Sequence, residues 1–224
     1  MAEAVIKKGK RPSKEQRIQS ILQAAREVFE LRGYEKATVA EIAEKIGVVE
    51  GTVFSYFSSK RLLVSKVMEE FYADITRKIE GGISGIDGAR NKLFYVVWTH
   101  FTVVKENSAI CAVILGESRG VEHTFSDELQ DLNRRYSHVV GEIIEYGINE
   151  GAIAESTSVG LVRNVVFGTI EHYLWRMLDQ GVEMNVDELA EELTSLIFNG
   201  IATKNKSSNK SEVEQLIGKL NKLL

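Results

Sequence analysis

The sequence predicts an all-α protein with a small N-terminal three-helix domain, which contains a helix-turn-helix, and a larger C-terminal helical domain. Proline occurs once in the 224 residues, at Pro12, so every later segment is free to form long helices. Apolar residues recur at steps of three and four along most of the chain, which is the period of a helix with one buried face. Segments that alternate apolar and polar residues, as half-buried strands do, are scarce.

The N-terminal helices are bounded by capping residues and glycines. Ser13 is a suitable N-cap for the first helix, and Gly33 is expected to end it. Thr38 and Glu41 have the spacing of a capping box at the start of the second helix, which Gly47 ends. The helices expected in this part are 13–33, 38–47, 50–57 and 59–80.

A glycine-rich stretch follows these helices. Four glycines fall within residues 81–88, which predicts a loop or hinge there. Beyond it, helices are expected at 89–105, 108–119, 126–150, 158–180 and 186–203. The end of the chain is polar and then periodic over 212–224, which fits either a short tail helix or a frayed end. The expected organisation is a flexible basic arm (1–12), a helix-turn-helix domain (13–63), a second domain (64–204) and a polar tail (205–224).

The composition excludes several classes of protein. The single cysteine, Cys111, rules out an intrachain disulfide and a cysteine-rich zinc site, and it fits a reducing compartment. No apolar segment of a secretory signal follows the basic N-terminus, and no uncharged apolar run reaches the roughly 18 residues of a membrane span. We therefore expect a cytoplasmic protein that does not contact a membrane.

Motifs of common enzymes are absent from the sequence. The chain has no nucleophile elbow, zinc-protease motif, phosphate-binding loop or dinucleotide fingerprint. The four histidines stand at 100, 123, 138 and 172, without the spacing of metal ligands. We expect no enzymatic activity, no metal and no cofactor.

Charge is distributed unevenly along the chain. Residues 1–63 have 12 basic and 8 acidic side chains, whereas the remaining residues have 16 basic and 24 acidic ones. A basic N-terminal part on an acidic body is the arrangement of a nucleic-acid-binding module joined to another kind of domain. Ordinary surface variation would explain the difference equally well.

The stretch 38–57 reads TVAEIAEKIGVVEGTVFSYF and predicts two short helices joined by a tight turn at Gly47. In a DNA-binding helix-turn-helix the first helix supports the second, which lies in the major groove. The small Ala43 lets the two helices approach each other, and the apolar positions around it fix their crossing angle. The motif therefore predicts binding to double-stranded DNA.

This motif resembles that of the TetR family of bacterial transcription regulators. The family pattern is matched at Thr38, Ile42, Ala43, Gly47, Val48, Gly51, Thr52, Tyr56, Phe57 and Lys60. The preceding helix and turn match it at Ala24, Ala25, Phe29, Gly33 and Tyr34. The resemblance implies a repressor that binds a palindromic operator as a homodimer and leaves it when a small molecule binds the second domain. A ligand-independent DNA-binding protein and a transcriptional activator are the alternatives.

The resemblance assigns DNA contacts to the second helix of the motif and its flanks. Thr38 and Lys60 are expected to meet phosphates, and Thr52 and Tyr56 to approach the DNA from the recognition helix. The basic arm either reaches phosphates or the minor groove, or is a disordered tail. The full set expected at the DNA is Thr38, Val49, Glu50, Thr52, Phe54, Ser55, Tyr56 and Lys60.

Four of these residues depart from the family pattern or leave their role open. Phe54 replaces the usual tyrosine and either touches a thymine methyl group or packs. Val49 and Glu50 stand where polar and often basic residues are common. Glu50 either accepts a hydrogen bond from a cytosine amino group or is a solvated residue at the start of the helix. Ser55 is small and could bond several bases.

The last two long helices are expected to form the dimer interface. The helix at 186–203 has an apolar stripe with three-four spacing, and the helix at 158–180 is apolar on more than one face. A helix that is apolar on two sides must bury both, so one side can pack within the subunit and the other against a second copy. A purely intramolecular core would also explain the pattern; the family resemblance favours the dimer.

The middle of the chain is rich in large apolar side chains, some of which are expected to line an effector cavity. His100 is either part of such a cavity or an ordinary core or surface histidine. Arg119 would meet an acidic ligand group or form a surface salt bridge. The residues expected to contact the ligand are Phe94, Trp98, Phe101, Ile114, Arg119, Tyr136, Phe167 and Glu171.

The C-terminal region resembles the regulators of fatty-acid degradation within the TetR family. The resemblance rests on FGTIE at 167–171 with an aromatic turn through Trp175, and on HF at 100–101 followed by ESR at 117–119. Those regulators release DNA when they bind long-chain acyl-CoA. The expected effector is therefore a small hydrophobic molecule, either acyl-CoA or another hydrophobic or aromatic compound.

Overall fold

The computed structural model describes residues 12–119 and 126–203. In these ranges the chain forms nine α-helices, and its β-structure is limited to an isolated bridge between Ile153 and Ala202. The all-α prediction is confirmed. The helices are α1 (Lys14–Lys36), α2 (Val39–Lys45), α3 (Glu50–Tyr56), α4 (Lys60–Ile83), α5 (Ala89–Glu106), α6 (Ser108–Arg119), α7 (Ser126–Asn149), α8 (Val159–Gln180) and α9 (Val186–Ile201).

Most helix boundaries agree with the sequence-based ones to within two residues, but α1 and α4 are longer than predicted. Gly33 takes a φ of 72°, which glycine adopts easily, yet it produces a kink rather than the end of the helix. Helical structure resumes as far as Lys36. The Ala37 amide closes the extra turn by donating to the Gly33 carbonyl oxygen at 3.2 Å.

The glycine-rich hinge is shorter than the sequence indicated, because α4 continues through Gly81 and Gly82 to Ile83. Packing explains this, since a Cβ atom at Gly82 would overlap the ring of Tyr95 on α5. The Tyr95 hydroxyl in turn donates to the Lys78 carbonyl oxygen at 3.2 Å. Gly82 thus allows close packing of α4 and α5, which offsets the roughly 1 kcal/mol that a glycine costs inside a helix.

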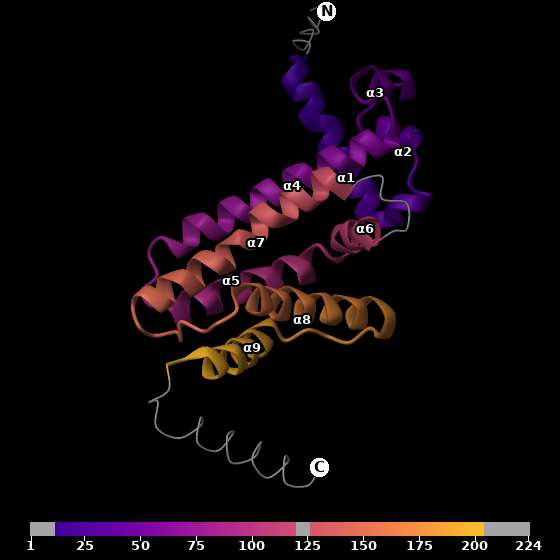
Figure 1. The fold of residues 1–224 in the computed structure, drawn as a ribbon. Coiled ribbons are helices and arrows are strands. Elements are labelled where there is room, and N and C mark those ends of the chain that lie inside the picture. The colour runs from indigo at the N-terminus through magenta and orange to yellow at the C-terminus, as the bar shows by residue number, and fades with distance from the viewer. Residues whose placement is uncertain (1–11, 120–125, 204–224) are drawn as a thin grey trace, which may run out of the picture.

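The helices are arranged in a small N-terminal unit and a larger stack (Figure 1). The short helices α2 and α3 lie at one end of the molecule, near the N-terminus. The long helices α4 and α7 run side by side away from them, and α8 and α9 lie at the opposite end. α5 packs on α4, α7, α8 and α9, while α1 packs on both α4 and α6.

One hydrophobic core runs through the described part of the chain. It extends from Phe29 and Ile42 in the N-terminal helices, through Met68 and Leu93, to Ile170 in α8. The N-terminal unit is therefore packed against the larger stack of helices. A movement of α4 or α6 would change the position of the N-terminal unit. None of the described helices is long and apolar enough to span a membrane. The predictions for residues 1–11 and 204–224 lie outside the described residues.

Candidate functional site

The first helix of the motif begins with the predicted capping box. The Thr38 hydroxyl oxygen accepts the Glu41 amide at 3.2 Å, and the Glu41 carboxylate accepts the Thr38 amide at 3.0 Å. The hydrogen bond from the Thr38 backbone, followed by the one from its hydroxyl, lowers the pKa of the Glu41 carboxyl group. The box satisfies two backbone donors that would otherwise be unpaired, and it fixes the exposed Thr38 at the surface.

The turn between α2 and α3 depends on Gly47, which has a φ of 68°. The Val48 amide donates to the Ala43 carbonyl oxygen at 3.0 Å, so the chain reverses directly after α2. Ala43 and Ile42 from α2 and Val53 from α3 are buried together. The predicted helix-turn-helix geometry is therefore present, with α3 held by its inner face.

The outer face of α3 points to solvent. Val49, Glu50, Phe54 and Ser55 are exposed, whereas Thr52 and Tyr56 are half-buried. The Ser55 hydroxyl donates to the Thr52 carbonyl oxygen at 2.6 Å. An exposed helix with one buried edge is the form of a recognition helix that enters the major groove. The exposure of Phe54, 43%, favours a contact outside the protein over packing in its core.

Lys60 follows the motif at the first position of α4. Its ammonium group donates to the Glu35 carbonyl oxygen at 3.2 Å and lies 4.4 Å from the centre of the Tyr34 ring. The cation is thus held at the surface of the N-terminal unit by the end of α1. A carbonyl and an aromatic ring leave its positive charge unneutralised, as a phosphate contact requires.

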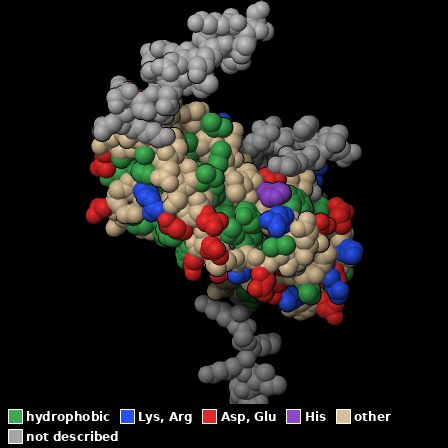
Figure 2. All heavy atoms as spheres, turned by 90° about the horizontal axis from the view of Figure 1, so that it is seen from below, with side chains coloured by type: hydrophobic (Ala, Val, Ile, Leu, Met, Phe, Trp, Pro, Cys, Tyr) green, Lys and Arg blue, Asp and Glu red, His purple; other side chains and the backbone are tan. Residues whose placement is uncertain are grey.

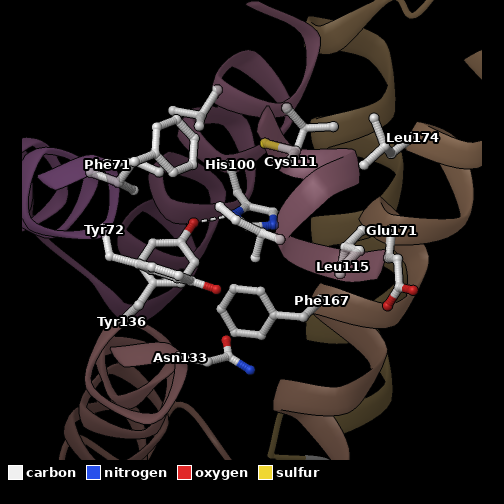
Figure 3. Close-up of a pocket in the computed structure, with 14 residues that line it drawn as sticks. Phe71, Tyr72, His100, Cys111, Leu115, Asn133, Tyr136, Phe167, Glu171 and Leu174 are labelled. Carbon is white, nitrogen blue, oxygen red and sulfur yellow. Dashed lines mark hydrogen bonds between the residues drawn. The ribbon is translucent and has the colours of Figure 1, made fainter. Parts of the chain in front are cut away.

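The second candidate site is a cavity of about 130 Å³ that is lined by side chains from five helices (Figure 3). Its walls are mostly aliphatic and aromatic side chains. The lining residues are Phe71, Tyr72 and Ile75 from α4, His100, Val103 and Val104 from α5, Cys111, Ile114 and Leu115 from α6, Asn133 and Tyr136 from α7, and Phe167, Glu171 and Leu174 from α8.

Four of the predicted ligand contacts line this cavity: Ile114, Tyr136, Phe167 and Glu171. His100, which the sequence left undecided between cavity and core, also lines it. The side chain of Arg119, at the end of α6, lies outside the described residues. The contributions of α4 were missed, because an apolar stripe in the sequence does not show which of its residues border a void.

Phe94, Trp98 and Phe101 do not line the cavity, although the sequence suggested that they would. Phe101 is fully buried and packs edge-on against the Tyr173 ring. The Trp98 indole donates to a carboxylate oxygen of Asp187 at 2.7 Å. The reason is helical phase: successive residues are about 100° apart around the helix axis, so the α5 face that presents His100 directs its neighbours elsewhere.

A hydrogen-bonded aromatic pair forms the polar part of the cavity. His100 Nδ1 and the Tyr136 hydroxyl share a hydrogen bond, and their rings are stacked with centres 5.3 Å apart. Phe167 meets the His100 ring edge-on at 5.0 Å. Burial lowers the pKa of His100 to about 3 and raises that of Tyr136 well above its usual value. Both groups are therefore neutral at pH 7.

The other titratable lining residues leave the cavity without a positive charge. Burial raises the pKa of Cys111 to about 12, so its thiol is neutral as well. Neither lysine nor arginine is among the described lining residues, and Glu171 is the charged group there. The cavity therefore suits the uncharged, hydrophobic part of a ligand.

Arg26 of α1 connects the N-terminal unit to the cavity wall. Its guanidinium lies over the ring of the lining residue Phe71, 5.5 Å from the ring centre. The same group donates to the Asn107 side chain at the junction of α5 and α6, and to Glu30 at 2.9 Å. A change in the positions of α4 or α6 would therefore reach α1 directly.

α8 and α9 carry exposed apolar side chains on the face away from the core. Figure 2 views the molecule from this side and shows hydrophobic side chains between charged ones. Val166 and Ile170 of α8 are fully buried, so α8 has the two apolar sides that the sequence predicted. The exposed large apolar residues on these two helices are Leu161, Trp175, Leu178 and Leu196.

Comparison with known proteins covers nearly the whole chain. Residues 21–67 match the family described as bacterial regulatory proteins, tetR family, and residues 65–200 match the YsiA-like protein, C-terminal region. The fatty acid metabolism regulator protein of Bacillus subtilis is 29% identical over 199 residues, which are 88% of this chain and all of that protein. The repressor KstR2 of Rhodococcus jostii is 25% identical over 82% of this chain and 90% of its own length.

Solved structures agree with these relationships. The structure of FadR from Bacillus subtilis in complex with stearoyl-CoA matches this one with a TM-score of 0.72 and 28% sequence identity. The match covers 82% of this chain and 98% of the FadR chain. FadR from Bacillus halodurans, at 21% identity with a TM-score of 0.74 over 85% of this chain and 98% of its own, supports the fold. These relatives are transcription regulators and not enzymes. The chain belongs to the TetR family of bacterial transcription regulators and has a C-terminal domain like that of the fatty-acid-degradation regulator FadR.

Proposed function

We propose that this protein is a homodimeric cytoplasmic repressor that binds a palindromic operator and releases it when a long-chain acyl-CoA binds. The observation that carries the proposal is the mostly apolar cavity that is lined in part by α4, the helix that begins at the end of the helix-turn-helix. The FadR protein of Bacillus subtilis, solved with stearoyl-CoA, is similar over nearly its whole length. An apolar cavity of this kind takes the hydrocarbon chain, for which each buried methylene contributes about 0.8 kcal/mol.

The electrostatics of the cavity favour a thioester over a free fatty acid. The carboxylate of a fatty acid placed inside would be buried, and neither lysine nor arginine is among the described lining residues to pair with that ligand group. Burying an unpaired charge is costly. A thioester carbonyl is uncharged, and the His100–Tyr136 pair offers it a polar neighbour.

At the DNA, the exposed row of α3 reads bases and the flanking residues bind phosphates. Glu50, Phe54 and Ser55 face the major groove in this arrangement, with Val49 at the start of the helix. Thr52 and Tyr56 approach the backbone from the half-buried edge, while Thr38 and Lys60 contact phosphates on either side. Two such helices in a dimer would lie about 34–36 Å apart, one turn of the duplex.

Ligand binding is coupled to DNA binding through α4. Phe71, Tyr72 and Ile75 of α4 line the cavity, and the N-terminal end of the same helix is capped by Ser59, directly after the recognition helix. A ligand that needs more room than the cavity provides displaces α4 and, through Arg26, also α1. The separation of the two recognition helices then changes, and the ligand is bound more tightly by the form that binds DNA less well.

Native mass spectrometry of the intact protein tests the effector class. Stearoyl-CoA, stearate and free CoA are offered in turn at equal concentration. We expect one stearoyl-CoA per chain. Stearate is expected to bind at least tenfold more weakly because its carboxylate would be buried without a cation, and CoA more weakly still because it lacks the hydrocarbon chain. Binding of none of the three would favour a DNA-binding protein without this effector.

The exposed apolar face of α8 and α9 supports the dimer. Leu196 is 71% exposed on α9, and Trp175 and Leu178 are exposed on α8. Isolated exposed apolar residues are common on protein surfaces, but a group of large ones on two adjacent helices is typical of an interaction site. Two copies of this helix pair related by a twofold axis would bury them in a four-helix interface.

The substitution Leu196→Glu is expected to convert the dimer into a monomer, because it would bury a carboxylate in the interface. Light scattering coupled to gel filtration measures the mass. Leu31→Glu is the matched control, since Leu31 is 79% exposed on α1, away from this face. Dimers of both variants would contradict the proposed interface.

A further inference from the structure

The cavity is small for the ligand that the proposed function requires. Its volume of about 130 Å³ is below the roughly 300–1,000 Å³ of most small-molecule sites. The cavity is therefore too small, as described, to hold a long acyl chain together with the rest of an acyl-CoA. A long acyl chain needs additional space, and the polar remainder of the molecule needs a route to the surface.

A second hollow lies against the cavity, between α4 and α7. It has a volume of about 80 Å³ and we call it the α4/α7 crevice. Tyr136 borders both the cavity and the crevice. The lining residues of the crevice are Thr76, Ile79 and Glu80 of α4 and Arg135, Tyr136, His138, Val139 and Glu142 of α7.

Tyr136 is the residue that the described linings of the two hollows share. Its hydroxyl is hydrogen-bonded to His100, and its ring packs on Tyr72 and Phe167 with centres 5.8 Å and 5.5 Å away. Figure 3 shows it entering the cavity from α7 towards His100. A ligand that displaces the ring must replace one neutral hydrogen bond, worth about 0.5–1.5 kcal/mol, and ring contacts worth about as much each.

The chemistry of the crevice suits a polar but uncharged chain. Glu80 of α4 lies across the crevice from Arg135, His138 and Glu142 of α7. His138 Nε2 and a Glu142 carboxylate oxygen are 3.9 Å apart. Two carboxylates, one guanidinium and one imidazole give both donors and acceptors without an excess of positive charge, which fits the amide-rich arm next to a CoA thioester better than its phosphates.

We propose that the effector site extends from the cavity past Tyr136 into the α4/α7 crevice, with the Tyr136 ring acting as the gate. The inference rests on the proposed function for the identity of the ligand. It also gives a reason for the movement of α4, because a chain lying between α4 and α7 separates the two helices.

The single cysteine makes the gate measurable without any effector. Cys111 is buried and lines the cavity, so its rate of modification by N-ethylmaleimide reports access to the interior. We expect Tyr136→Ala to raise this rate at least tenfold and Tyr136→Phe to raise it about threefold. Adding Val139→Trp to Tyr136→Ala, which fills the crevice, is expected to return the rate towards that of the wild type.

Tyr146→Ala is the matched control, because Tyr146 is a half-buried tyrosine of the same helix that borders neither hollow. Equal rates in Tyr136→Ala and the wild type, or equal acceleration by Tyr146→Ala, would overturn the gate. Stopped-flow association of stearoyl-CoA with the same variants completes the test. Faster modification of Cys111 without binding of stearoyl-CoA to any variant would leave the gate in place and contradict the proposed effector instead.

Discussion

The variant Ile114→Phe is expected to bind operator DNA as the wild type does, but acyl-CoA is expected not to release it from the DNA. Ile114 is buried and lines the cavity, and a larger ring there occupies space that the acyl chain needs. Placing a larger side chain in a filled core lowers the stability of a protein by about 1–3 kcal/mol. The empty space beside Ile114 reduces that loss. We expect at least a 100-fold rise in the stearoyl-CoA concentration that releases half of the DNA, measured by fluorescence anisotropy of a labelled duplex.

Val113→Phe provides the control for this experiment. Val113 is the preceding residue of the same helix and is half-buried, but it does not line the cavity. Its response to stearoyl-CoA is expected to match that of the wild type. A normal response of Ile114→Phe, or equal losses in both variants, would mean that the effector binds elsewhere.

The double variant Thr52→Ala/Tyr56→Phe is expected to lose operator affinity by about 100-fold or more. Hydrogen bonds to charged groups contribute about 1.5–3 kcal/mol each, and this change removes two hydroxyl groups from α3. The fold is retained because the Tyr56 ring, which packs on the core, is kept and alanine is a good helix former. Anisotropy titrations at several salt concentrations measure the effect.

The salt dependence of DNA affinity distinguishes the loss of two uncharged contacts from misfolding of the DNA-binding domain. The double variant alters no charge, so the slope of log affinity against log salt is expected to stay as in the wild type. Thr102→Ala/Tyr146→Phe removes the same two kinds of hydroxyl group from α5 and α7 and is expected to bind DNA normally. Unchanged affinity in the α3 double variant would contradict the assignment of α3 as the recognition helix.

The parts of the structure that follow local rules were predictable from the sequence. The Thr38–Glu41 capping box and the positive φ of Gly47 depend on residues within one turn of each other. The end of α4 was not predictable in this way. Gly82 looked like part of a loop, but the Tyr95 ring packs against it from a different helix, and such a contact leaves no local pattern.

The cavity residues, too, were predictable from the sequence only in part. Ile114 and Tyr136 were identified among the large apolar residues of the middle helices, whereas Phe101 was expected at the ligand and lies in the core. Periodicity shows which side of a helix is buried, but both a void and a packed core are buried. Phe71 was not singled out in the sequence as a ligand contact, because its place on the cavity wall follows only from how α4 packs with the other helices around the cavity.

The effect of stearoyl-CoA on the protein's affinity for DNA tests the central claim, that the cavity controls the helix-turn-helix. The duplex is a palindrome selected from a random library by the wild-type protein. We expect saturating stearoyl-CoA to weaken DNA binding by about 5- to 150-fold, and DNA to weaken stearoyl-CoA binding by the same factor, since coupling is reciprocal. An unchanged DNA affinity while stearoyl-CoA is bound would contradict the account, and an increased affinity would show that the ligand acts in the opposite direction.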